Sequence, residues 1–120
     1  MRLHKEGTSL SDSGKYEDAI EKFMEASKLY EKANNSFDAA YTLFKAAECS
    51  FFLKDYDTAL NRFIKSAEIA LEKGYDRFGL GALEYALDCF KAEGKERDNE
   101  AAELKKKIAE IKIRIEASNF

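Results

Sequence analysis

The chain has 120 residues, of which 45% are hydrophobic and 36% are charged, and its formal net charge is −3 at pH 7. This composition is too apolar for a disordered chain, and the interleaved charges exclude an extended basic surface for nucleic acid. Proline is absent, whereas alanine, leucine, lysine and glutamate are abundant. Because proline breaks helix interiors, we expect an all-α fold in a single domain over residues 1–120.

Two further features bear on the location of the protein. No window approaches the roughly 20 apolar residues of a membrane-spanning helix, and residues 1–6 lack the apolar core of a signal peptide. Two cysteines are also too few for the disulfide framework of a secreted domain. We therefore expect a cytoplasmic protein without a membrane span.

Apolar residues recur along the chain at intervals of three and four, which is typical of amphipathic helices. In the central region, for example, Leu43, Ala46 and Ala47 share one face of a helix, and Leu60, Phe63 and Ala67 share a face of the next. The pattern predicts six helices with short connections, over residues 2–13, 16–33, 37–53, 56–73, 77–93 and 97–117.

The chain also matches itself at a shift of 40 residues. Asn34 then aligns with Gly74, and both residue types accept the left-handed conformation that ends many helices. Ser36 aligns with Asp76, and both are expected N-caps. The sequence therefore predicts three helical hairpins, approximately residues 1–34, 36–74 and 76–117, with central turns at Gly14, Lys54 and Gly94.

The last helix departs from this repeat. Its apolar residues form a separate stripe, while its other sides carry lysine, arginine and glutamate. A terminal unit with a polar outer face prevents a stacked array from sticking to its neighbours, so we interpret this helix as a cap. The stripe consists of Ala101, Leu104, Ile108, Ile111 and Ile115.

Two segments resemble the second half of a tetratricopeptide repeat. Residues 14–26 contain the complete spacing Gly-x-Tyr-x-x-Ala-x-x-x-Phe-x-x-Ala, and residues 55–63 contain most of it. Gly7 and Ala47 match the small position of the family's first helix. The resemblance implies a right-handed stack of three antiparallel helical hairpins, an α-α superhelix that binds other proteins and has no enzymatic activity.

The period of 40 residues is longer than the usual 34 or so of that repeat. Longer helices and the pattern Ala39-Ala40-x-x-x-Phe44-x-x-Ala47 are similar to the soluble NSF attachment proteins, membrane-fusion adaptors built from elongated hairpins of this kind. Armadillo and HEAT repeats have a similar period but usually contain a proline and a different charge pattern.

In tetratricopeptide arrays the first helices of the hairpins line a concave groove. The resemblance implies a groove that binds a peptide or helix with apolar anchors beside lysine or arginine. The alternative is that Phe44 and Phe51 pack between hairpins while the acidic residues form a solvated face. The expected groove residues are Tyr41, Phe44, Glu48 and Phe51 from the second hairpin, Glu84, Asp88 and Lys91 from the third, and His4, Thr8 and Ser11 from the first.

We expect no catalytic, metal or cofactor site. Cys49 and Cys89 occupy equivalent positions in successive repeats, which favours two small buried core residues over a redox or metal pair. His4 lies near the terminus without metal ligands at a suitable spacing, and we expect it to be exposed to solvent. Gly79 and Gly81 lack the rest of a dinucleotide-binding loop and indicate a helix start or close packing of helices.

The sequence therefore favours a protein-binding scaffold or adaptor. Two alternatives to this function are consistent with the same sequence. The isoleucine-rich last helix could pair with a copy of itself in a homodimer. The chain could also be a fragment of a larger repeat protein.

Overall fold

The computed structural model describes residues 1–94 and 98–118 of the chain. Within them lie six α-helices and no strand, as the hydrophobic periodicity predicts. The helix ends agree with the predicted ranges to within one residue. The helices are α1 (Arg2–Asp12), α2 (Tyr16–Lys32), α3 (Ser36–Phe52), α4 (Tyr56–Glu72), α5 (Asp76–Glu93) and α6 (Asp98–Ser118).

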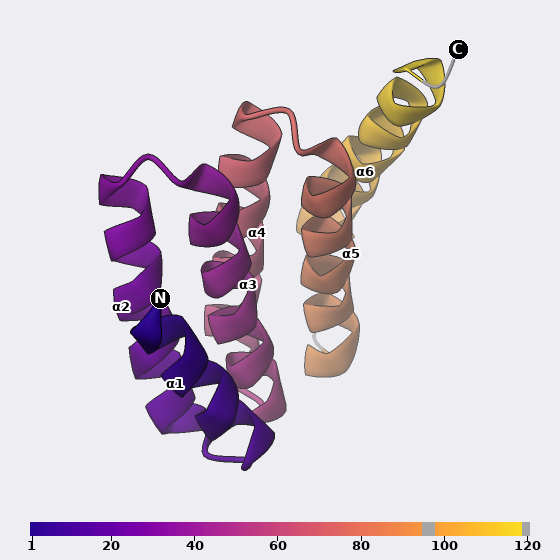
Figure 1. Ribbon diagram of the computed structural model, residues 1–120. Coiled ribbons are helices and arrows are strands. Elements are labelled where there is room, and N and C mark those ends of the chain that lie inside the picture. The colour runs from indigo at the N-terminus through magenta and orange to yellow at the C-terminus, as the bar shows by residue number, and fades with distance from the viewer. Residues whose placement is uncertain (95–97, 119–120) are drawn as a thin grey trace.

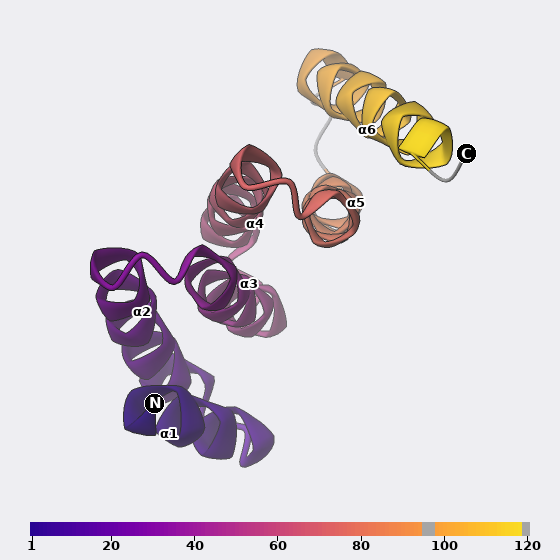
Figure 2. The ribbon, with the colours of Figure 1, turned by 45° about the horizontal axis from the view of Figure 1, so that its top comes forward.

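Consecutive helices run antiparallel and pack in succession, so that the hairpins form a stack with the two termini at opposite ends (Figure 1). Figure 2 shows two layers, with α1, α3 and α5 in one and α2, α4 and α6 in the other. The predicted all-α stack of hairpins is therefore confirmed. In Figure 1, α6 is visibly inclined to α5 instead of running alongside it as α4 runs beside α3.

Every helix from α1 to α5 is followed by a residue with positive φ, and these residues recur at intervals of 20 positions: Gly14, Asn34, Lys54, Gly74 and Gly94. The first four turns also share their hydrogen bonds. After α3, for example, the Lys54 N–H donates to the Phe51 carbonyl at 2.9 Å and the Asp55 N–H donates to the Ser50 carbonyl at 2.9 Å. This paired bonding satisfies carbonyls that the helix end leaves open, and it keeps each connection short.

The predicted N-caps are each displaced by one residue. Ser36 and Asp76 are the first residues of α3 and α5, and the caps are Asn35 and Tyr75. The reason is that the residue after each left-handed position has two roles. Its N–H group closes the preceding turn, and the same residue is the N-cap of the next helix. Asn35 is suited to this place, because its Oδ1 accepts a hydrogen bond from the Asp38 N–H at 3.3 Å.

The core consists of small and aromatic residues at equivalent places in successive hairpins. Phe23 of α2 and Phe63 of α4 are both 0% exposed, as are Ala19 and Ala59 one turn earlier. The alanines allow neighbouring helices to approach, and the phenylalanine rings fill the space between them. Across the stack, the Ser66 hydroxyl donates to the Ala40 carbonyl at 2.6 Å.

The last helix buries one narrow stripe, as predicted. Leu104, Ile108, Ile111 and Ile115 are buried in the same cluster as Phe63, whereas Ala101 is half-buried at its edge. Near the other end of α6, the Arg114 guanidinium donates to both carboxylate oxygens of Asp76, each at 3.1 Å. This bidentate pair joins α6 to the first turn of α5.

Candidate protein-binding face

A continuous series of rings crosses the layer of first helices. His4 of α1 lies 5.6 Å from Tyr41 of α3, and Tyr41 lies 6.3 Å from Phe78 of α5, measured between ring centroids. Phe44 of α3 lies 5.6 Å from Phe78 and 5.1 Å from Tyr85. These separations are in the range of favourable aromatic pairs. The rings therefore connect all three hairpins on one side of the stack.

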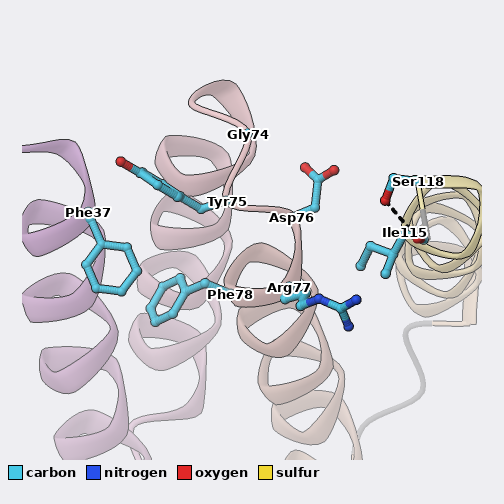
Figure 3. Close-up of a pocket in the computed structure, with 8 residues that line it drawn as sticks. All are labelled: Phe37, Gly74, Tyr75, Asp76, Arg77, Phe78, Ile115 and Ser118. Atoms are coloured by element: carbon cyan, nitrogen blue, oxygen red, sulfur yellow. Dashed lines mark hydrogen bonds between the residues drawn. The ribbon is translucent and has the colours of Figure 1, made fainter. Parts of the chain in front are cut away.

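The series continues along the edge of the stack that contains the α2–α3 and α4–α5 connections. The Phe37 and Tyr75 rings meet edge to face at 5.3 Å, and Phe37 and Phe78 point toward each other across the two hairpins (Figure 3). Together with Ile115, these rings line an open hollow of about 650 Å³. We call the whole set the aromatic face: His4, Phe37, Tyr41, Phe44, Tyr75, Phe78 and Tyr85.

Much of this face is accessible to solvent. Phe37 is 41% exposed, Tyr75 is 42% exposed and Tyr85 is 45% exposed, while Tyr41 and Phe78 are half-buried.

Two of these rings also pack against the buried core. Phe44 and Tyr85 both contact Phe63, which is fully buried, with centroids 5.2 and 5.5 Å away. Two rings of the face are therefore packed directly on the buried core.

The residues predicted for the groove fall into separate groups. Tyr41 and Phe44 belong to the aromatic face. Phe51 lies at the opposite end of α3, where its ring packs against Tyr56 at 5.2 Å.

Glu48 lies between Phe44 and Phe51 along α3 and accepts a hydrogen bond from the Lys45 ammonium group at 2.7 Å. Burial of the lysine opposes its charge, but this bond and the charge of Glu48 hold the Lys45 pKa above its ordinary value.

The third-hairpin residues lie on another side of α5. Glu84, Asp88 and Lys91 line a groove of about 440 Å³ between α5 and α6. Lys105 and Lys112 of α6 line the same groove, and the Lys112 ammonium group lies 4.0 Å from a Glu84 carboxylate oxygen. These charged residues thus border the aromatic face without continuing its row of rings.

The prediction that His4 is exposed is wrong. The ring is half-buried because α1 folds back over α2 and α3, and it packs against Phe23, Tyr30 and Tyr41. Its Nδ1 lies 3.2 Å from the Tyr30 hydroxyl in a hydrogen bond. Burial is the main reason that the pKa of His4 is below its ordinary value of 6.5, and the negative charge of Asp38 partly opposes this shift.

The other predicted residues of α1 have local roles. The Thr8 hydroxyl donates to the His4 carbonyl at 3.0 Å. Ser11 accepts a hydrogen bond from the Cys49 thiol at 3.6 Å. Both cysteines are free and buried, as predicted, and burial raises the pKa of Cys89 to about 12.

Sequence reasoning missed Phe37, Tyr75, Phe78 and Tyr85. The repeat alignment concealed them, because a shift of 40 residues pairs Phe37 with Arg77 and Tyr85 with Lys45. A different signal was present. Phe37, Tyr41 and Phe44 are spaced by four and three residues, and Phe78 and Tyr85 by seven, which places each set on one side of its helix.

No three histidine, cysteine, aspartate or glutamate side chains converge as possible metal ligands in residues 1–94 and 98–118. None of the helices in the part of the chain that the structure describes is long and apolar enough to cross a bilayer.

Comparison with known proteins identifies a family. The family model of the soluble NSF attachment proteins matches residues 3–117. Comparisons with curated proteins and with solved structures found no match. The match therefore extends from the first helix, α1, to the last, α6. This chain therefore belongs to the soluble NSF attachment protein family.

Proposed function

We propose that this protein is a non-enzymatic adaptor that binds a peptide or helix of another protein along the aromatic face. The observation that carries this proposal is the connected series of rings in the aromatic face, three of which are more than 40% exposed. Folded proteins rarely leave contiguous apolar patches exposed, and such patches often mark interaction sites. Aromatic residues are also enriched where binding energy concentrates at interfaces.

Family membership supports the same conclusion. The family name describes a protein that attaches another protein, and membership indicates an adaptor role in protein interactions. We further propose that this adaptor acts in the cytoplasm.

We propose that the partner also carries basic residues, which approach the acidic side chains beside the aromatic face. We propose that Tyr41 and Phe44 contact apolar anchors of the partner, while Glu48, Glu84 and Asp88 select lysine or arginine beside them. Glu48 and Glu84 each have a lysine neighbour within the chain. Exposed ion pairs contribute about 0–1 kcal/mol, so a cation of the partner can take the place of Lys112 at Glu84. Phe51 and Lys91 form the outer margin of this proposed surface.

The packing beneath the face favours binding without a large ordering cost. Phe44 and Tyr85 contact Phe63, and the C-terminal ends of α1 to α4 are closed by backbone hydrogen bonds. A receptor surface that is already ordered loses little conformational entropy when the partner docks.

Self-association through α6 has less support. Its apolar stripe, Leu104, Ile108, Ile111 and Ile115, is buried within the chain's own core. Ile113 is the large apolar residue that α6 exposes, at 67%. One exposed side chain is too small a surface for a stable helix pair, which needs apolar contacts repeated along the helix.

Quantitative affinity capture from lysate of the source cells tests the proposal. The wild-type chain is compared with a Phe37→Ala, Tyr85→Ala double variant. Both side chains are more than 40% exposed, so their removal should leave the helical circular dichroism unchanged. A captured partner is then purified, and its affinity for each chain is measured. We expect the double variant to bind at least about tenfold more weakly, because two aromatic contacts are lost.

A Phe52→Ala, Leu53→Ala double variant is the matched control. These residues are 53% and 41% exposed and lie at the α3–α4 turn, away from the aromatic face. We expect this variant to retain the wild-type affinity. Equal affinity of the wild type and the Phe37→Ala, Tyr85→Ala variant for every captured protein would contradict the proposal.

A further inference from the structure

Most glycines of the chain are explained by the fold itself. Gly14, Gly74 and Gly94 have positive φ at the ends of helices. Gly7 and Gly79 lie inside helices at close contacts, where a Cβ would come within 2.8 Å of Phe23 and 2.6 Å of Leu71, respectively.

Gly81 has neither explanation. It lies inside α5 and its φ is not positive. Apart from its chain neighbours and its own helix backbone, no atom of residues 1–94 and 98–118 would lie within 4 Å of a Cβ at this position. Glycine inside a helix costs about 0.5–1 kcal/mol of stability relative to alanine. The chain's own packing therefore gives no reason for this glycine, and the space above it is open.

The neighbours of Gly81 define a small surface. Glu84, Tyr85 and Asp88 follow it by three, four and seven residues, so the four positions adjoin one another on α5. Such a set of four is the arrangement that receives one side chain from a packed partner helix. All three neighbours are exposed. We call this set, Gly81, Glu84, Tyr85 and Asp88, the Gly81 notch.

The notch combines an open backbone, an aromatic ring and two carboxylates. Tyr85 belongs to the aromatic face, because its ring lies 5.1 Å from Phe44, and Glu84 lies at the border with α6. Lys91 and Lys105 line the same groove as Glu84. Lys112 lies 4.0 Å from a Glu84 carboxylate oxygen, and both side chains of this pair are more than half exposed. This pair is weak enough for another cation to replace it.

We propose that the Gly81 notch binds an arginine side chain that a partner protein presents from a helix. The methylene groups of the arginine cross Gly81, where no Cβ obstructs them. The guanidinium group then faces the Tyr85 ring and the carboxylates of Glu84 and Asp88. Arginine suits this place better than lysine, because its planar group stacks on aromatic rings and binds carboxylates through two donors. This inference rests on the proposed function, since it assigns the partner's chemistry at the same surface.

A panel of synthetic peptides tests the inference directly. Each peptide is an amphipathic helix, held helical by a hydrocarbon staple, with leucines on one side and a single arginine beside them. The arginine position varies across the panel, and each peptide has a matched version with citrulline, which has nearly the same shape without the charge. We expect the wild-type chain to bind the best arginine peptide about tenfold more tightly than its citrulline version, as expected for a cation–π contact with a charge-assisted hydrogen bond.

Gly81→Ala is the critical variant. Alanine should raise the midpoint of thermal unfolding, since it favours the helix and meets no neighbouring atom. It should nevertheless weaken binding of the arginine peptide by about fivefold, because its Cβ occupies the path of the arginine stem. A loss of binding in a more stable protein cannot result from unfolding.

A charge-matched comparison completes the test. The Glu84→Gln, Asp88→Asn variant should reduce the preference for arginine over citrulline to less than about twofold, because the paired carboxylates are removed. Glu103→Gln, Glu116→Gln removes the same charge from α6 and should keep the tenfold preference.

Three results would contradict these expectations. Equal binding of the arginine and citrulline peptides by the wild type would overturn the inference and the proposed charge selection by Glu84 and Asp88, and it would leave the adaptor role of the aromatic face standing. Unchanged binding by Gly81→Ala would overturn the inference and leave the proposed function standing. If no peptide of the panel bound the wild type, the proposed function and the inference would both fail.

Discussion

Gly7 of α1 lies so close to Phe23 of α2 that a Cβ on Gly7 would be 2.8 Å from the phenylalanine ring. Phe23 is 0% exposed, so protein atoms surround its ring. The absence of a side chain at position 7 therefore sets the distance between the first two helices. We expect Gly7→Ala to lower the free energy of unfolding by about 1–3 kcal/mol, the usual cost of overpacking a core.

Gly81→Ala is the matched control, because it makes the same chemical change in open space. It should raise the free energy of unfolding by about 0.5–1 kcal/mol. Urea denaturation followed by circular dichroism measures both variants. A stabilising Gly7→Ala substitution would show that α1 does not pack against Phe23 in this way.

Lys54 occupies a left-handed turn with φ of 64°, whereas the equivalent positions 14, 74 and 94 hold glycine. A side chain in this conformation is strained, although glycine loses more entropy on folding. We expect Lys54→Gly to raise the free energy of unfolding by about 0.5–1 kcal/mol. The reverse change, Gly14→Ala, should lower it by about 1 kcal/mol, and chemical denaturation measures both. A destabilising Lys54→Gly substitution would contradict the left-handed turn.

His4 makes the stability of the protein depend on pH. Its pKa in the folded chain is lower than the ordinary 6.5, mainly because the ring is buried. The neutral ring therefore stabilises the fold above pH 6.5, and this contribution is lost as the pH falls through the folded-state pKa. NMR titration of the single histidine should give a midpoint below 6.5.

The corresponding stability measurement compares the wild type with His4→Gln. The advantage of the wild type over the variant should be larger at pH 8 than at pH 5, because only the wild type has a ring to protonate. An equal difference at the two pH values, or a midpoint above 6.5, would show that the ring is not buried as described.

Two isoleucines of α6 provide a test of its docking. Ile111 is 3% exposed and belongs to the main core cluster, whereas Ile113 is 67% exposed. We expect Ile111→Ala to lower the free energy of unfolding by about 2–4 kcal/mol, because it removes buried apolar surface and leaves a cavity. Ile113→Ala should change it by less than about 0.5 kcal/mol. Similar effects of both substitutions in thermal or urea unfolding would mean that α6 does not present this stripe to the core.

Much of the fold could be predicted from the sequence, because the periodic signals are local and strong. The three-four spacing of Leu43, Ala46 and Ala47 places α3, and the 40-residue repeat places the turns at Asn34 and Gly74. The N-cap residue of each helix could not be identified from the sequence pattern. The choice between Asn35 and Ser36 depends on the hydrogen bonds of the preceding turn, which periodicity does not reveal.

The candidate site was less accessible to prediction, because it depends on contacts between hairpins. The resemblance to tetratricopeptide repeats placed Tyr41 and Phe44 in the predicted groove, and their rings lie in the aromatic face. It could not show that Phe78 would lie within 5.6 Å of Phe44, or that Glu84 would approach Lys112 of α6. His4 was misjudged for the same reason, since its burial results from Tyr30 and Tyr41, far away in the sequence.

The most direct test of the adaptor proposal is an NMR titration of the isotopically labelled wild-type chain with the tightest-binding arginine peptide. We expect the largest chemical-shift changes to cluster at five residues on the exposed side of α3 and α5: Tyr41, Phe44, Phe78, Gly81 and Tyr85. Changes centred on the exposed surface of α2, α4 or α6, with the aromatic face unperturbed, would contradict it.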